Sequence, residues 1–187
     1  VPERLWQAGL HVGLNAICLT HLHADHSFGI VPLLVRYNEE GRRAPLHLFG
    51  PRGTERFVSR LLEMGYPGFT KRLKFPIQFS TLVPGVTLDF NRLRLSCAPT
   101  VHSVLNYTIR VDLPGKKGAS FAVSGDGQIT DATQALVHDV DVLFQEVYSE
   151  TPGIPVHADL ETVSGWITRS QVKLIVTSHF ARSSKEV

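Results

Sequence analysis

Four side chains that commonly bind metal ions lie close together near the start of the chain. The run HLHADH directly follows Asn15–Thr20, an apolar segment typical of a buried strand. Residues i and i+2 of an extended chain project to the same side, so His21 and His23 can bind one ion, while Asp25 and His26, at the turn into the next helix, can bind a second. Imidazole and carboxylate ligands suit Zn²⁺, and Mn²⁺ or Fe is also compatible. The alternative is a surface loop that is rich in histidine by chance.

One loop cannot complete two metal sites, so further ligands should follow other strands. Three residues have this setting: His102 in PTVHS, Asp126 in the turn SGDG, and His179 at the end of KLIVTSH. Each lies just past an apolar run, where a loop can reach a shared cleft while the strand stays buried. Taken singly, each has a simpler interpretation, a structural histidine or a turn or helix-cap aspartate. Their shared position at strand ends favours ligation.

The elements that must position these residues alternate along the chain. Apolar runs predict strands, and apolar residues spaced at i, i+3 and i+4 predict helices. Asn91-Arg92 is typical of a hairpin turn. A strand-rich middle with β-α-β alternation at both ends predicts an α/β fold, sheets covered by helices, in a single domain over residues 1–187. The predicted strands are 15–20, 46–49, 86–90, 93–97, 107–113, 120–124, 142–147 and 173–177, and the predicted helices are 30–37, 57–65, 131–137 and 158–169.

Composition excludes several classes of protein. Of the 187 residues, 43% are hydrophobic and 19% are charged, which argues against disorder. The longest apolar run, Phe28–Val35, has eight residues, whereas a membrane-spanning helix needs about 20. Cys18 and Cys97 are the only cysteines, so a disulfide framework is not expected. The first ten residues lack the pattern of a signal peptide, and we expect a cytoplasmic protein that does not contact a membrane.

Basic residues are concentrated in segment 36–74. It holds nine basic and four acidic residues and has a net charge of +5, whereas the rest of the chain has −3. Such a segment can attract a polyanion. A solvated helical face is the alternative interpretation.

These motifs together resemble the metallo-β-lactamase fold superfamily. The resemblance rests on HxHxDH, an isolated histidine, a Gly-Asp turn and a last strand that ends in histidine, in that order from Asn15 to His179. Further features resemble the ribonuclease Z-like branch of phosphodiesterases. These are the SGD turn, the strand ending in Gln145-Glu146, the separate His157 and the ending TSHF.

The resemblance implies a four-layer αββα sandwich with two metal ions at one edge of the sheets. Zn²⁺ is the metal that we expect there. Members of the superfamily usually have one or two strands before the strand that leads to HxHxDH. Only about fourteen residues precede Asn15, so we expect these N-terminal strands to be absent from this chain. The domain would then be truncated, and the end at 182–187, which resembles the start of a helix, suggests the same.

The resemblance also assigns the ligands. The first ion would be held by His21, His23 and His102, the second by Asp25, His26 and His179, and the carboxylate of Asp126 would bridge the two.

His157 and Glu146 receive separate roles from the resemblance. His157, expected to open the helix 158–169, would contact the phosphate or protonate the leaving oxygen, and Glu146 would orient it through a carboxylate–imidazole hydrogen bond. Asp25 would accept a proton from the attacking water. The alternatives are a capping or surface histidine and a salt-bridged glutamate. His11, His47 and His138 are interpreted as structural or exposed.

The implied function is hydrolysis of phosphodiesters, as a tRNA 3′-end endonuclease or as a phosphodiesterase of cyclic nucleotides or other small substrates. Homodimers are common in this branch. His102 and Asp126 are 24 residues apart, and the long arm of many tRNA-processing members does not fit that interval. Segment 36–74, with its turn 65–69, is therefore a candidate substitute contact surface. The alternatives are hydrolysis of another ester, such as a sulfate ester or a lactone, and an inactive metal-binding module that binds nucleic acid.

Overall fold

A computed structural model describes residues 2–115 and 118–181 of the chain. The protein mixes helices and strands in two compact units, Val1–Thr81 (unit 1) and Leu82–Val187 (unit 2), and each contains one sheet with its own helices. The prediction of a single domain over 1–187 stays a prediction, and each unit is described separately below.

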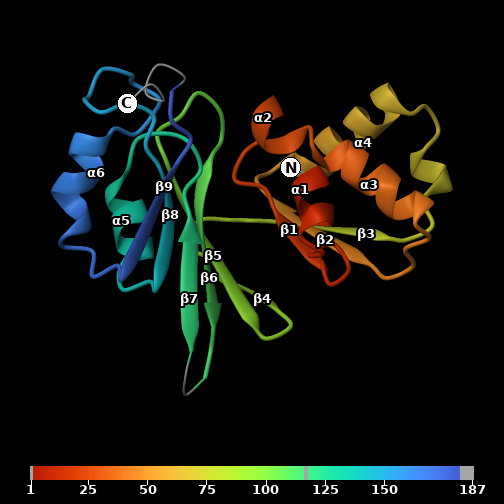
Figure 1. The fold of residues 1–187 in the computed structure, drawn as a ribbon, viewed down its shortest axis with the longest axis horizontal. Helices are drawn as coiled ribbons and strands as arrows, with labels where there is room; N and C mark the ends of the chain where they lie inside the picture. The colour runs from red at the N-terminus through yellow and green to blue at the C-terminus, as the bar shows by residue number, and fades with distance from the viewer. Residues whose placement is uncertain (1, 116–117, 182–187) are drawn as a thin grey trace. The chain divides into compact units, whose positions relative to one another are not determined.

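Unit 1 contains a three-stranded parallel sheet in the order β1-β2-β3. Helices connect the strands and bring the chain back across the sheet, so that all three strands start at the same end (Figure 1). The elements are α1 (Pro2–Gln7), β1 (Ala16–Cys18), α2 (Ala24–Ser27), α3 (Ile30–Glu39), β2 (Leu46–Gly50), α4 (Thr54–Gly65), the 3₁₀ turn η1 (Thr70–Arg72) and β3 (Ile77–Thr81).

The core of unit 1 lies between this sheet and helices α3 and α4. Leu46 and Leu48 project from the same side of β2 and are fully buried, together with Leu34 of α3 and Leu62 of α4. The apolar periodicity correctly predicted both helices. It missed β3, a five-residue strand whose pattern IQFST alternates too briefly to stand out.

Unit 2 contains a six-stranded sheet in the order β4-β5-β6-β7-β8-β9. The first four strands form an antiparallel meander, whereas β7, β8 and β9 are parallel and are linked by helices α5 and α6. The elements are β4 (Leu88–Phe90), β5 (Leu93–Pro99), β6 (Tyr107–Leu113), β7 (Ala119–Val123), α5 (Asp131–Val137), β8 (Val142–Glu146), α6 (Leu160–Ile167) and β9 (Leu174–Ser178).

Helices α5 and α6 cover the same face of the unit 2 sheet (Figure 1). Val137 of α5 and Trp166 of α6 pack in one buried cluster with Ala122 of β7 and Leu143 of β8. This cluster fixes the parallel strands against their crossover helices. As a result β5, β7, β8 and β9 all run in one direction, and their carboxyl ends meet at one edge of the sheet.

The hairpin, the later strands and α5 lie where the sequence predicts them, but the start of the last helix differs. The prediction places it at Ala158, directly after His157, whereas α6 begins at Leu160. Asp159 is the N-cap, because its carboxylate accepts a hydrogen bond from the Thr162 amide at 2.8 Å. His157 therefore lies in the turn before the helix and does not open it.

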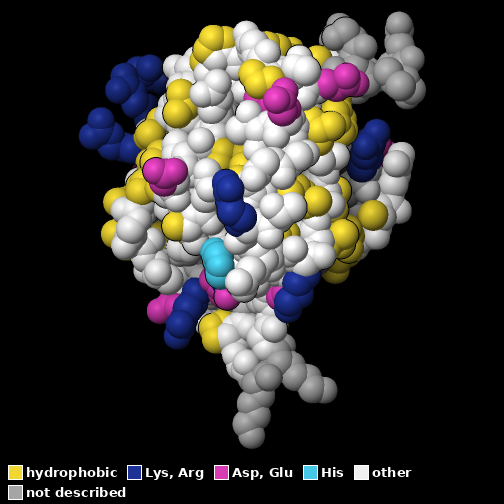
Figure 2. Space-filling model, turned by 90° about the vertical axis from the view of Figure 1, so that its left-hand side faces the viewer, with side chains coloured by type: hydrophobic (Ala, Val, Ile, Leu, Met, Phe, Trp, Pro, Cys, Tyr) yellow, Lys and Arg dark blue, Asp and Glu magenta, His cyan; other side chains and the backbone are white. Residues whose placement is uncertain are grey.

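Basic side chains are dispersed over the face of unit 2 that carries α6, and several lie beside acidic ones (Figure 2). Within unit 2, ion pairs such as Arg110–Asp112, at 2.9 Å, neutralise part of the basic charge. Within residues 2–115 and 118–181, no helix has the length and apolar character that crossing a membrane requires.

Candidate metal centre

The loop after β1 gathers three imidazoles in unit 1. The ring of His21 lies 4.9 Å from that of His23 and 4.1 Å from that of His26, measured between centroids. The Asp25 carboxylate lies 3.4 Å from Nε2 of His26. His21 is fully buried, and its Nδ1 lies 3.1 Å from the hydroxyl of Thr20. All four candidates of the HxHxDH run are thus close neighbours.

The geometry of this loop comes from the short helix α2. The hydroxyl of Ser27 donates to the carbonyl of His23 at 2.7 Å and lies within 3.2 Å of that of Leu22, which folds the loop back on itself. Asp25 and His26 lie on α2, so they project away from the extended direction that carries His21 and His23.

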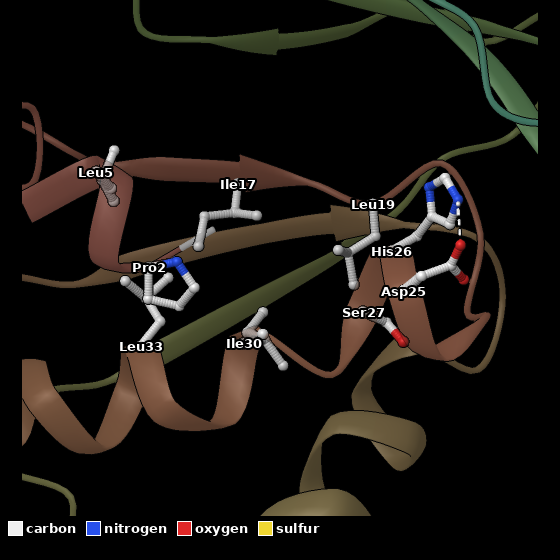
Figure 3. Close-up of a pocket in the computed structure, with 10 residues that line it drawn as sticks. Pro2, Leu5, Ile17, Leu19, Asp25, His26, Ser27, Ile30 and Leu33 are labelled. Carbon is white, nitrogen blue, oxygen red and sulfur yellow. Dashed lines mark ion pairs between the residues drawn. The ribbon is translucent and has the colours of Figure 1, made fainter. Parts of the chain in front are cut away.

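A hollow in unit 1 adjoins Asp25 and His26. Figure 3 shows this acid–histidine pair at one end and apolar side chains along the rest of the hollow. Such walls cannot compensate the charge of a phosphate group. The polar side chains of this hollow therefore come only from the ligand loop. The hollow is lined by Pro2, Leu5, Ile17, Leu19, Asp25, His26, Ser27, Gly29, Ile30 and Leu33.

Unit 2 collects a second set of candidates at the edge where its parallel strands end. His102 follows β5, Asp126 follows β7, Glu146 ends β8 and His179 follows β9. Asp126, Glu146 and His179 each offer a ligand atom, and these atoms lie within 4.8 Å of one another. The strand directions explain this convergence of residues that are up to 53 positions apart.

His179 is oriented by the carboxylate of Asp126, at 2.6 Å from its Nδ1. Asp126 is 4% exposed, and its carboxylate lies close to a second buried one, that of Glu146. The backbone of His179 has a positive φ of 62°, in the left-handed region that non-glycine residues seldom adopt. Strain of this kind concentrates at functional sites.

Several close contacts hold the loop that carries Asp126. The side-chain amide of Asn106 donates to the main-chain carbonyl of Asp126, which the Thr100 hydroxyl also contacts at 2.7 Å. Gly125 lies so close to Asn106 that a β-carbon there would overlap the amide. The backbone of Val101 pairs with that of Gln128 at 3.0 Å in both directions. This bridge fixes the start of the His102 loop beside the Asp126 turn.

The ring orientation of His102 is set by a main-chain carbonyl. Its Nδ1 lies 2.7 Å from the oxygen of Val156. A carbonyl only accepts hydrogen bonds, so Nδ1 carries the proton and Nε2 holds the lone pair of the neutral ring. Nε2 is therefore the nitrogen of His102 that could bind a metal ion.

Glu146 and His157 form the carboxylate–imidazole hydrogen bond that the resemblance implies, between Oε1 and Nδ1. The other carboxylate oxygen accepts from the amides of Gly127 at 2.6 Å and Ala158 at 3.1 Å. Burial raises the pKa of the Glu146 carboxyl, while the bonds from His157 and Ala158 act in the opposite direction.

Three rings surround His157, and one of them, that of Tyr148, was not singled out in the sequence. The ring of Tyr148 stacks on it with a centroid distance of 4.3 Å and an angle of 20°. The ring centroids of His102 and His179 lie 5.3 and 5.9 Å from that of His157. The signal for Tyr148 was its position, two residues past Glu146 at the end of β8. The role of Asn106 had no comparable signal.

The donors in both units are imidazoles and carboxylates, which are ligand types that zinc sites use. Buried carboxylates close to one another, such as those of Asp126 and Glu146, are costly unless a cation compensates them. The donor chemistry therefore fits divalent metal ions. The remaining histidines lie elsewhere: His11 stacks on Trp6, His47 lies within β2, and His138 is exposed at the end of α5.

Comparison with known proteins decides the family. Residues 3–180 match the family model of the beta-lactamase superfamily domain. The chain belongs to this family. It is 37% identical over 106 residues to a ribonuclease Z of Shouchella clausii, a match over 56% of this chain and 32% of that protein. A ribonuclease Z of Latilactobacillus sakei is 36% identical over 106 residues, with 55% and 33% covered.

A solved member of the same fold also resembles the chain. The short form of human tRNase Z has a TM-score of 0.79 at 20% identity and matches 97% of this chain and 79% of that one. The metallo-β-lactamase fold expected from the sequence is thus confirmed. The chain spans about a third of the length of the curated relatives it matches, since 32% and 33% of them are covered.

Proposed function

We propose that the protein is a metal-dependent hydrolase of phosphodiesters that acts on RNA, in the manner of ribonuclease Z. The observation that supports this proposal most strongly is the cluster of side chains at the strand ends of unit 2. There, the buried carboxylate of Asp126 contacts the partly exposed His179 beside His157, and Glu146 contacts both histidines. The names of the curated relatives support the substrate class. Small phosphodiesters, including cyclic nucleotides, are the competing substrates within this proposal.

We propose a centre of two zinc ions, with Mn²⁺ or Fe as alternatives. The ligand assignment follows the resemblance: His21, His23 and His102 for one ion, Asp25, His26 and His179 for the other, and Asp126 as the bridge. The clustering of donors within each unit supports it. Two bound cations would lower the pKa of water toward neutrality and offset negative charge on the phosphate.

The chain's own residues then handle the protons. Asp25, whose carboxylate is largely exposed beside His26, would accept the proton of the attacking water. His157 has Nδ1 bonded to Glu146, which leaves Nε2 facing away from that bond. When the ring carries protons on both nitrogens, Nε2 would deliver its proton to the departing oxygen and leave the neutral ring with its proton on Nδ1. Glu146 is buried and is a positioning residue for His157.

Metal analysis and a substrate panel test the proposal. Purified protein should contain bound Zn²⁺, Mn²⁺ or Fe and should hydrolyse bis(p-nitrophenyl) phosphate, with activity lost on chelation and restored by Zn²⁺ or Mn²⁺. Activity on precursor tRNA, compared with activity on cyclic nucleotides, distinguishes an RNA substrate from a small phosphodiester substrate. A sulfate ester and a lactone, included as substrates, test the alternative that the protein hydrolyses another kind of ester. Absence of hydrolysis from a metal-loaded protein would overturn the proposal and favour the inactive metal-binding module.

Replacement of His157 tests the proton delivery. His157→Ala should slow turnover by about 100- to 10,000-fold, the usual contribution of general acid–base catalysis, with the metal content unchanged. His138→Ala removes an exposed histidine at the end of α5 and serves as the matched control. Loss of metal from His157→Ala would contradict the role given to it. The homodimer and the cytoplasmic location are further proposals, tested by sedimentation and by cell fractionation.

A further inference from the structure

Three arginines are spaced four residues apart along helix α4 of unit 1. Arg52 precedes the helix, and Arg56 and Arg60 lie one turn apart within it, so these last two share one side of the helix. All three are exposed. Within residues 2–115 and 118–181, none of their guanidinium groups has an acidic partner, unlike Arg36, which pairs with Glu40 at 3.0 Å. Their charge is therefore available to a ligand.

Apolar side chains lie directly beside these arginines. Arg56 and Arg60 border a hollow with the ring of Phe28, which is 49% exposed, and that of Phe57, 6.3 Å away between centroids. An exposed aromatic ring bordered by free cations is unusual for a merely solvated helical face. The hollow is lined by Phe28, Gly53, Arg56, Phe57, Arg60, Leu61 and Met64.

The acidic residues of the helix neutralise only part of this charge. Residues 52–72 contain five basic and two acidic side chains. The carboxylate of Glu63 is held by the amide of Gly68 at 2.7 Å and by the hydroxyl of Thr70, at the turn after the helix. The second acid, Glu55, is exposed in the first turn. The region keeps a net positive charge.

We infer that this face, the α4 basic surface of Arg52, Arg56, Arg60 and Phe28, binds a single-stranded segment of the RNA substrate. Guanidinium groups would contact successive phosphates, and a base would stack on the exposed ring of Phe28. Unneutralised arginines favour a polyanion over an apolar protein segment. The inference rests on the proposed function for the choice of RNA. It narrows the contact surface expected in segment 36–74 to three arginines and adds Phe28 from outside that segment.

Binding of a single-stranded RNA oligonucleotide without hydrolysis tests this inference. The anisotropy of a fluorescent 12-mer is measured with EDTA present, so the result does not depend on catalysis. The variants are Arg56→Gln/Arg60→Gln and Phe28→Leu, the second of which keeps apolar volume but removes the ring. The matched control is Arg92→Gln/Arg94→Gln, which removes two exposed arginines from the β4–β5 hairpin of unit 2.

The two variants should weaken binding in different ways. Arg56→Gln/Arg60→Gln should raise Kd at least 10-fold and reduce the slope of log Kd against log salt by about 1.4, at about 0.7 per lost phosphate contact. Phe28→Leu should raise Kd about 5- to 100-fold with the slope unchanged, because stacking is not electrostatic. The control variant should keep both the Kd and the slope of the wild type.

Three results would overturn the inference. One is equal weakening by the control, which would indicate a general charge effect. Another is an unchanged Kd in both α4 surface variants. The third is a Phe28→Leu variant that keeps its RNA affinity but changes its oligomeric state in sedimentation. That result would assign the surface to a contact between protein chains. Since none of these readouts involves hydrolysis, failure here is distinct from failure of the proposed function.

Discussion

Glu146 holds His157 through a hydrogen bond between its carboxylate and ring Nδ1, while its second oxygen accepts from two buried main-chain amides. A carboxylate only accepts, so this arrangement places the proton of the neutral ring on Nδ1 and leaves Nε2 as the reactive atom. The amides anchor the carboxylate at Gly127, beside Asp126, and at Ala158, beside His157. One buried acid thereby ties the candidate proton donor to the loop of the candidate bridging ligand.

Glu146→Gln should reverse the tautomer of His157. The glutamine oxygen can still accept from the two amides, but its NH₂ group would then face Nδ1 and donate to it, which moves the ring proton to Nε2. We expect turnover to fall about 10- to 100-fold, the usual cost of losing an orienting partner. Nitrogen-15 NMR of the histidine ring measures the tautomer directly. Persistence of the proton on Nδ1 would contradict this account.

Arg110 should contribute more to stability than an exposed arginine in the same sheet. It donates to the carbonyls of Leu136 at 3.0 Å and His138 at 2.8 Å, at the end of α5, and pairs with Asp112 and Asp139. Arg110→Ala should lower the free energy of unfolding by about 1–3 kcal/mol, measured with urea, because hydrogen bonds with charged donors are lost in a partly buried setting.

Arg94→Ala is the control for this measurement. Arg94 pairs with Asp89 at 3.7 Å between two largely exposed side chains. Pairs of this kind contribute about 0–1 kcal/mol. If both variants lowered the free energy of unfolding equally, the hydrogen bonds of Arg110 to the end of α5 would contribute no more to stability than an exposed ion pair.

The local signals in the sequence identified most of the elements, but not the contacts that fix their loops. Apolar runs predicted the strands because each is buried on at least one face, and the HxHxDH run marked its own loop. The carbonyl of Val156 that orients His102, and the Asn106 amide beside Asp126, depend on how loops 54 and 20 residues apart pack together. No local pattern encodes such contacts.

The error at the start of α6 had a different origin. The pattern Asp159-x-x-Thr162 is itself a capping signal, and it was present in the sequence. Apolar spacing alone extended the helix back to Ala158. The expectation of αββα layers and the proposed partition of ligands between two ions came from resemblance to a family, since no local sequence pattern encodes either.

Glu63 should make the stability of unit 1 sensitive to acid. Hydrogen bonds from the hydroxyl of Thr70 and the amide of Gly68 lower the pKa of its carboxyl below the ordinary 4.5. A depressed pKa in the folded state stabilises the protein above the unfolded-state pKa, and this contribution is lost as the pH falls through the folded-state pKa. The difference in unfolding free energy between wild type and Glu63→Gln should therefore be present at pH 7 and shrink below pH 4.5.

Urea titrations of both proteins at several pH values check this expectation. Glu150→Gln removes an exposed carboxylate in unit 2 and controls for the change in net charge. A difference between wild type and Glu63→Gln that grows toward acid pH would have the wrong sign for the proposed linkage.

Gly125→Ala should disturb the Asp126 loop through a steric overlap. A β-carbon at Gly125 would overlap the side-chain amide of Asn106, which is 1% exposed and has no space to withdraw. Moving Asn106 would release the main-chain carbonyl of Asp126 that its amide contacts. We expect a loss of about 1–3 kcal/mol in unfolding free energy, as for other overpacked buried sites, together with weaker metal binding.

Gly165→Ala makes the same chemical change where there is room for it. Gly165 lies within α6, is exposed, and has no neighbouring atom within 4 Å of the added carbon. Alanine should stabilise the helix there by about 0.5–1 kcal/mol, because glycine has the greater conformational freedom in the unfolded chain. Thermal unfolding with and without Zn²⁺ compares the two variants. If Gly125→Ala melted with the wild type and showed the same shift on adding Zn²⁺, the contact between Asn106 and Asp126 would not be what holds this ligand in position.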